Sequence, residues 1–454
     1  MTGAITYNYL HWVSLSNLIN WSVGYLLETE PGYNNKYPLA PMSVFLSRNK
    51  TSIDIQDHVL YTRVTIRTSG MGVTVRDKLL GEKIGTKKQF IIHSGQFLIS
   101  KIDARNGAFG VVPDEADDAV ITGNFWTFDV DTSKINPAYL TLLTSTKQFV
   151  SFAEKASNGT TNRHYLQENL FLAAKIPLPT LEEQNKIIAA YNSTLAQAKR
   201  LYEQAQEIEE QIENYWHDIL GVATRQREKV QTDKYRYLKF TDFYDLSEWG
   251  IDIIQNKQKR EIFKYPIKKI KTLCQLGSGG TPSRSNPRYY KGSIPWVKTG
   301  EVVNDEIFET EEHITEEAIS NSSAKVYPKG SLIIAMYGQG DTRGRTAKLG
   351  VDSTTNQACA VLYNIDNSFV TTDYLWYYLQ SRYHDLRSMA SGNNQPNLNA
   401  GKINNYTVVL PPIDIQKKIV IHIQEQKAQI KRLKQQAETL RKDALVEFEK
   451  AIFE

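Results

Sequence analysis

The sequence Lys175-Ile-Pro-Leu-Pro-Thr-Leu-Glu-Glu-Gln184 leads from an extended segment into a long helical pattern, and a related sequence, Val408-Val-Leu-Pro-Pro-Ile-Asp-Ile-Gln416, does the same later. Leu178-Pro179 matches Leu410-Pro411, and Gln184 matches Gln416, with one offset of 232 residues (416 − 184). Proline disfavours continuation of a helix from the segment before it, so each helix begins after the prolines. The repeat therefore predicts two tandem halves, each a globular domain followed by a helical rod.

The length, net charge and cysteine count of the chain set broad limits on the class of protein. A chain of 454 residues has room for about three domains, and its net charge of +4 permits nucleic-acid binding without requiring it. Two cysteines, Cys274 and Cys359, are too few for a disulfide scaffold. No apolar run approaches the ~18 residues of a membrane span, and the first residues lack the pattern of a signal peptide. We therefore expect a soluble, cytoplasmic protein.

Residues 1–175 are predicted to form the first domain, with a mixed α/β fold. Apolar runs bounded by turn residues predict strands at Phe90–His93, Gln96–Ile102 and Phe125–Val130. Helical patterns follow at 138–144, directly after Pro137 in the favourable first-turn position, and at 146–156.

Residues 176–221 are predicted to carry the first rod. The stretch from Leu181 to Leu220 contains no Gly or Pro, Thr180 and Glu183 have the spacing of a capping box, and Gly221 can end the helix. At ~1.5 Å per residue the rod would be about 60 Å long. Apolar residues recur at spacings of three and four, which is typical of a coiled-coil seam: Ile188, Tyr191, Leu195, Ala198, Leu201, Ala205, Ile208, Ile212, Tyr215 and Ile219.

The second half repeats this order. A basic connector (222–265) leads into a second domain (266–407), with strands predicted at 331–337 and 358–363 and a helix at 373–379. The second rod segment (408–454) is free of Gly and Pro from Ile413 to about Phe453. Gly95 and Tyr139 of the first domain correspond to Gly330 and Tyr374, both with an offset of 235 (330 − 95, 374 − 139).

The two rods differ in charge. Residues 181–220 hold 3 Lys/Arg and 8 Asp/Glu, a balance of −5, whereas residues 413–452 hold 9 and 6, a balance of +3. Opposite charge and equal length favour pairing of the rods with each other. The alternative is that each rod binds a separate partner or self-associates.

Motifs for catalysis are missing from the sequence. It has no Walker-type phosphate loop, no Cys/His cluster with metal spacing, and no Asn-Pro-Pro-[Tyr/Phe] motif of amino-methylating DNA enzymes. The Gly-rich stretch Gly277-Ser-Gly-Gly-Thr-Pro282 lacks the lysine of a phosphate loop, and Pro282 interrupts the helix start that such a loop uses. We interpret this stretch as a tight turn leading into a β-domain.

Polar and basic loops occur at matching places in both halves. Ser100–Gly107 follows a predicted strand, as Tyr337–Arg345 does in the second half, and the polar loops 157–165 and 391–397 follow later in each. Arg and Lys can hold phosphates or read guanine, whereas Asn and Gln can read adenine. The alternative is that these are ordinary solvated loops.

The chain resembles the specificity (S) subunits of type I restriction–modification systems (the HsdS family). The paired helix starts at 176–184 and 409–416 carry this resemblance, together with Gly277–Pro282, the Tyr289–Trp296 stretch and Ser100–Gly107. The first domain lacks a counterpart of the Gly-x-Thr-Pro and Ile-Pro-Trp motifs. The resemblance implies an α+β fold, with two tandem target-recognition domains and two long helices paired as an antiparallel coiled coil.

The resemblance also implies a function. Each domain would read one half of a split double-stranded DNA target, and the helices would set the spacing and dock two methyltransferase (M) subunits, with motor-nuclease (R) subunits completing the restriction complex. S-adenosylmethionine, ATP and magnesium would belong to those partners, so this chain would be non-catalytic and without cofactor or metal. The candidate DNA-binding residues are Lys87, Lys88, Lys101, Arg105, Asn106, Asn158, Thr160, Arg163, Tyr165, Ser283, Arg284, Lys298, Tyr337, Arg343, Arg345, Asn393, Asn394, Gln395 and Asn397.

Two other functions remain open at this point. The rods could join proteins in an assembly scaffold that reads no DNA sequence. The chain could also be the specificity module of a different DNA-modifying defence system.

Overall fold

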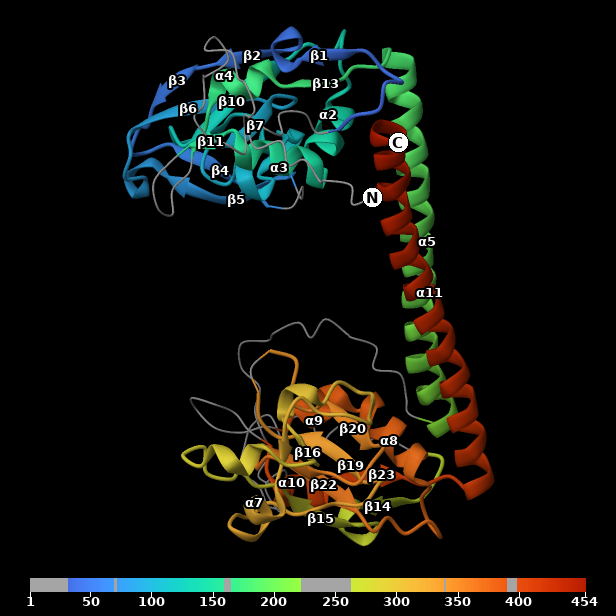
Figure 1. Cartoon of the computed structure of the whole chain (residues 1–454). Helices are drawn as coiled ribbons and strands as arrows, with labels where there is room; N and C mark the ends of the chain where they lie inside the picture. Colours follow the sequence, from blue (N-terminus) through green and yellow to red (C-terminus); the bar gives the residue numbers. More distant parts are fainter. Residues whose placement is uncertain (1–31, 69–71, 159–164, 222–262, 339, 390–397) are drawn as a thin grey trace, which may run out of the picture. The chain divides into compact units, whose positions relative to one another are not determined.

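A computed structural model describes residues 32–68, 72–158, 165–221, 263–338, 340–389 and 398–454. The chain divides into two compact units, one of residues 1–201 with 435–454 and the other of residues 202–434 (Figure 1). Each unit holds one mixed α/β domain and one end of both long helices. Most of the basic connector (222–262) and the loop 391–397 lie outside the described residues.

Two sheets make up most of the first domain. Strands β2, β10, β7 and β8 form an antiparallel sheet in that order, and β3, β6, β9, β4 and β5 form a second sheet in which only β4 and β9 run parallel. The strands are β1 (Leu39–Pro41), β2 (Leu46–Asn49), β3 (Ser52–Asp54), β4 (Leu60–Arg67), β5 (Gly72–Leu80), β6 (Lys88–Ile92), β7 (Phe97–Ser100), β8 (Phe109–Val111), β9 (Ala119–Ile121), β10 (Phe125–Val130), β11 (Ser157–Asn158), β12 (Tyr165–Leu166) and β13 (Lys175–Pro177).

The helices of the first domain cover its four-stranded sheet. They are α2 (Pro137–Thr144), α3 (Lys147–Lys155) and α4 (Glu168–Ala173), with short 3-10 turns η2 (Met42–Val44), η3 (Gly81–Lys83), η4 (Ala104–Asn106) and η5 (Asp114–Ala116). Phe97, Phe109, Phe149 and Phe171 are fully buried and contact one another between the sheet and these helices. The predicted mixed α/β class is confirmed.

The second unit uses a related plan. One sheet has the order β15-β22-β19-β20-β17, a smaller one has the order β18-β16-β21, and β14 pairs with β23. The strands are β14 (Ile267–Lys269), β15 (Gln275–Ser278), β16 (Ile294–Val297), β17 (Glu306–Ile307), β18 (His313–Ile314), β19 (Leu332–Ala335), β20 (Thr346–Leu349), β21 (Thr354–Thr355), β22 (Cys359–Tyr363) and β23 (Thr407–Val409). The helices and 3-10 turns are η7 (Ile270–Thr272), η8 (Pro287–Tyr290), η9 (Thr299–Glu301), α7 (Glu316–Ser320), α8 (Thr372–Ser381), α9 (Tyr383–Ser388) and α10 (Ala400–Asn405).

Both rods form as predicted. Helix α5 covers Leu181–Leu220 and α11 covers Ile413–Phe453. The strands before them, β13 and β23, pair with β1 and β14 in their own domains, so the helices begin five residues later than the predicted boundaries at 176 and 408. Thr180 Oγ1 accepts a hydrogen bond from the Glu183 amide at the start of α5, and Gly221 (φ +69°) follows its end.

The helices pair antiparallel within each unit. In the second unit Glu209 bonds Lys434 (2.7 Å). Tyr215, further along α5, packs against His422, which lies earlier in α11, with ring centroids 4.2 Å apart and a tilt of 38°. In the first unit Ile188 packs in one cluster with Phe448 and Ile452. The predicted seam residues of α5 are buried or half-buried, whereas the Glu209–Lys434 pair is about half exposed, so apolar burial contributes more than charge to the pairing.

The matching positions of Gln184 and Gln416 in the two halves have a structural reason. Gln184 Oε1 accepts a hydrogen bond from the Asn136 amide (2.7 Å), and its Nε2 donates to the carbonyls of Lys134 and Pro179. Gln416 makes the same three contacts with Thr371, Phe369 and Pro411.

Both glutamine side chains are fully buried, and Asn136 and Thr371 are the N-cap residues of α2 and α8. Each glutamine therefore fixes the start of a long helix to the start of a domain helix.

The Gly277–Pro282 stretch differs from the predicted tight turn. Gln275–Ser278 is strand β15, and none of the glycines 277, 279 and 280 has a positive φ. A side chain at Gly279 would meet the Thr355 carbonyl at 2.0 Å, and one at Gly280 would meet the Ala324 amide at 2.4 Å. These glycines are required because neighbouring backbone approaches them closely.

We expect both thiols to resist alkylation in the folded protein. Burial raises the pKa of Cys274 and of Cys359 to about 12, so the reactive thiolate is scarce at neutral pH. The raised pKa also means that burying the neutral thiols adds to the free energy of unfolding. This contribution is complete below the unfolded pKa of about 9 and is lost as the pH rises toward 12. Mass spectrometry after iodoacetamide treatment at pH 8 should show no modified cysteine without denaturant. Rapid labelling of the native protein would contradict this expectation.

Candidate nucleic-acid interface

Loops that are distant in sequence lie together where β7 ends and β8 and β10 begin, at one end of the strands of the four-stranded sheet in the first domain. Ser100 at the end of β7 lies opposite Phe125 at the start of β10, and β8 begins opposite Ile99. The Lys101 amide donates to the Asn124 carbonyl (3.0 Å), and the Leu166 amide donates to the Lys101 carbonyl (3.0 Å). We call residues 101–108, 122–124 and 165–166 the first loop edge.

The second domain repeats this arrangement. Ala335 at the end of β19 lies opposite Cys359 at the start of β22. The Met336 amide donates to the Ala358 carbonyl (2.9 Å), and the Leu398 amide donates to the Met336 carbonyl (3.1 Å). Strand β15 also ends here, with Ser278 opposite Ala360. We call residues 279–285, 336–338, 340–345, 356–358 and 398 the second loop edge.

The first loop edge carries part of the predicted set. Lys101 is half-buried over the Trp126 ring (5.5 Å), Arg105 lies in η4, and Asn106 is exposed. Gly107 closes this loop with a φ of +76°. Tyr165 is 37% exposed in β12, which pairs with β11 at Asn158. Thr160 and Arg163 lie outside the described residues.

Sequence reasoning missed two cations near Lys101. Burial lowers the pKa of Lys101, and the positive charges of Arg48 and Lys50 lower it further. Arg48 lies in β2 and also forms an ion pair with Glu168 (3.6 Å), whereas Lys50 directly follows that strand. The carboxylate of Glu168 acts on Lys101 in the opposite direction, so three positive charges face one negative charge, and the remaining positive charge favours an anion such as a phosphate. The Arg48-Asn49-Lys50 stretch, which ends a short strand and leaves it, was the available signal.

Lys87 and Lys88 lie elsewhere. Lys88 begins β6 in the other sheet of the first domain, and Lys87 directly precedes it. Lys87 bonds Asp57 and donates to the Gly81 carbonyl (2.8 Å). The structure therefore gives Lys87 a local role in holding two turns and does not bring either lysine into the loop-edge hydrogen bonds.

The second loop edge carries most of the remaining candidates. Tyr337 is 40% exposed, Arg345 is half-buried and lies 3.9 Å from Asp341, and the Arg343 carbonyl accepts a hydrogen bond from Arg387. Ser283 is exposed beside Arg284. Asn393, Asn394, Gln395 and Asn397 lie outside the described residues, although Leu398 directly after them is hydrogen-bonded at this edge.

Arg284 and Lys298 meet at one carboxylate. The two terminal nitrogens of the Arg284 guanidinium donate to the Glu312 carboxylate (2.6 and 3.2 Å). Lys298 Nζ lies 3.2 Å from a Glu312 oxygen and 2.5 Å from a Glu311 oxygen. The hydrogen bond from Arg284 holds the pKa of Glu312 below its usual range. The sequence offered no signal for this acidic pair.

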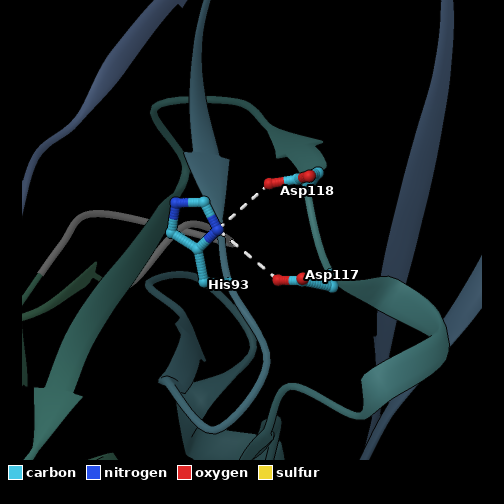
Figure 2. Close-up of side chains that lie close together, drawn as sticks. All are labelled: His93, Asp117 and Asp118. Atoms are coloured by element: carbon cyan, nitrogen blue, oxygen red, sulfur yellow. Dashed lines mark ion pairs between the residues drawn. The ribbon is translucent and has the colours of Figure 1, made fainter.

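A small cluster on the first domain consists of residue types that can bind a metal ion. Figure 2 shows the carboxylates of Asp117 and Asp118 pointing at the same nitrogen of His93, at 3.4 and 3.1 Å. The three residues are exposed. Their sequence separation of 24 and 25 residues (117 − 93, 118 − 93) hid them from motif searching. An ion pair between an exposed imidazole and two carboxylates accounts for this geometry.

A family model described as the type I restriction modification DNA specificity domain matches residues 43–214 and again 231–441. The chain belongs to this family. The two matches cover both tandem halves, which confirms the family resemblance that the paired helix starts carried. In the described residues, no helix is both long and apolar enough to cross a bilayer.

Specificity subunits are among the similar curated proteins. The MjaIX subunit of Methanocaldococcus jannaschii is 28% identical over 186 residues, which is 40% of this chain and 42% of the relative. The EcoR124I/EcoR124II subunit of Escherichia coli is 29% identical over 165 residues, 35% of this chain and 40% of the relative. These two alignments thus span about two fifths of each relative. The HindI subunit of Haemophilus influenzae is 22% identical over 371 residues, which is 72% of this chain and 80% of the relative.

A solved structure from work on complex assembly and conformational transition of the type I R-M system shares the fold. It has a TM-score of 0.59 and 17% identity, over 92% of this chain and 98% of the other. The two mixed α/β domains and the antiparallel pairing of α5 with α11 therefore agree with the family fold.

Proposed function

We propose that this chain is the sequence-reading subunit of a type I restriction–modification complex and that each loop edge contacts one half of a split double-stranded DNA target. The observation that carries this proposal is the repeated hydrogen-bond pattern at Lys101 and Met336. The same pattern holds different loops at the same edge of two related sheets. A common scaffold with divergent loops is what two domains need if they present different side chains to different bases.

The partners follow from the same proposal. Two methyltransferase subunits dock on the chain, restriction subunits join them, and S-adenosylmethionine, ATP and magnesium are bound by those partners. This chain then contributes recognition and spacing, and the chemistry takes place elsewhere in the complex.

Replacing Arg105 or Arg345 with alanine should relax DNA recognition at one half-site each. An arginine that bonds two acceptors of a guanine contributes about 1–3 kcal/mol of discrimination, so one base position should lose about 5- to 150-fold in preference. Long-read mapping of methylated adenines in cells carrying the complete complex measures this directly. Lys78→Ala, at an exposed lysine of β5 away from the loop edge, is the matched control. Unchanged methylation patterns in both arginine variants would contradict the assignment of these loops.

A scaffold that reads no sequence is the rival function. Selection from a randomised duplex pool by the co-expressed complex separates the two, since a scaffold enriches no sequence. Neighbouring reading frames distinguish a type I complex from a different DNA-modifying defence system.

A further inference from the structure

Arg284 is held firmly in place at the second loop edge. Its guanidinium lies over the Tyr290 ring (4.0 Å) and near the Trp296 ring (5.2 Å). Tyr290 donates a hydrogen bond to the Pro282 carbonyl, and Trp296 Nε1 donates to the Gly280 carbonyl. Both rings are therefore anchored to the loop that carries Arg284, and the guanidinium is pre-positioned by contacts that do not involve Glu312.

The anion on this guanidinium comes from the protein itself. Glu312 presents both carboxylate oxygens to Arg284 and a shared oxygen to Lys298. Its carbonyl accepts a hydrogen bond from the Trp296 amide (3.0 Å), so the carboxylate belongs to the same local framework. A guanidinium binds a carboxylate and a phosphate with the same paired geometry.

The cations remain accessible. The Arg284 side chain is 56% exposed, whereas Glu312 is 26% exposed. Exposed ion pairs contribute little to stability, typically ~0–1 kcal/mol. The arrangement is thus poorly suited to holding the fold together and well suited to exchange of one anion for another.

We propose that Glu312 determines specificity by occupying the phosphate position on Arg284, so that DNA gains this contact only by displacing it. This inference rests on the proposed function. Random DNA then binds weakly at this site, because the competing carboxylate cancels the general attraction of the Arg284 guanidinium. A target that also makes base contacts at the second loop edge has the additional binding energy to displace it.

Glu312→Gln should strengthen binding of the full chain to random-sequence duplex DNA. Lys298 keeps its ion pair with Glu311 (2.5 Å) in this variant, so only Arg284 gains a phosphate contact. One added contact steepens the dependence of log affinity on log salt by ~0.9 and raises affinity at 0.1 M salt by roughly 8-fold. Glu309→Gln is the matched control. It removes the same charge from an exposed residue that forms no ion pair among the described residues. Fluorescence anisotropy with a 40-base-pair random duplex as probe measures both quantities.

Two further variants make the outcome decisive. Glu311→Gln, at a 72% exposed position, loosens only Lys298 and should give a smaller gain. Arg284→Gln combined with Glu312→Gln should return affinity to near the wild-type value. Equal random-DNA affinity and salt slope in Glu312→Gln and Glu309→Gln would overturn the proposal, as would a gain that survives loss of Arg284. If the wild-type complex enriches no sequence from a randomised pool, the proposed function itself fails, whatever Glu312 does.

Discussion

Gln416→Ala should lower the free energy of unfolding of the second unit by about 3–5 kcal/mol. The substitution removes one acceptor and two donors, and leaves the Thr371 amide and the carbonyls of Phe369 and Pro411 without their partner in a fully buried place. A buried group without a hydrogen-bond partner costs about 1–3 kcal/mol, and three such groups near the lower end of that range give the expected loss. For a unit of this size the loss corresponds to a fall of roughly 10 °C in Tm.

Calorimetry of the full chain tests this expectation. Gln429→Ala, at an exposed position of the same helix, controls for the change in helix propensity. Gln416→Glu keeps an acceptor for Thr371 but turns a carboxylate toward two carbonyls, so it should also melt early and recover partly in acid, where the carboxyl can donate. Equal Tm values for Gln416→Ala and Gln429→Ala would show that the glutamine does not anchor the helix.

Adding seven residues to both long helices should abolish methylation at the original sites. The insertions belong after Leu201 in α5 and after Lys434 in α11, since seven residues preserve the alternation of three and four along the seam. The helices lengthen by ~10.5 Å, which equals about three base pairs at 3.4 Å each. Two half-sites with the old separation then no longer meet both domains, and any new sites should have a longer spacer.

Methylome mapping of cells that carry the lengthened chain reads out this change. A seven-residue insertion into the connector at 240, outside both helices, is the control. Methylation at the original spacer with both helices lengthened would mean that α5 and α11 do not set the separation. An inactive complex that still contains all its subunits would agree with the expectation, whereas loss of assembly would require the Tm of the variant to be compared first.

The sequence alone determined the tandem organisation and the elements with strong periodicity. Both long helices were predictable, because the Pro-containing starts and the absence of Gly and Pro are local signals, although the predicted rod segments began five residues before the helices do. Strand β10 and helix α2 were also predictable, because an apolar run between turn residues and a proline in the first turn act within a few residues.

Tertiary structure decided what the matched residues do. Gln184 and Gln416 were visible only as a repeat, and their role depends on backbone groups 45–50 residues away. The need for glycine at 279 and 280 arises only in a fold that places Thr355 and Ala324 against them. Arg284 and Lys298 were predicted as DNA-binding residues from their type, but only the pairing of β16 with β18 places Glu312 on both of them. Local patterns specify elements, whereas long-range contacts specify which charges face a ligand and which are already matched within the protein.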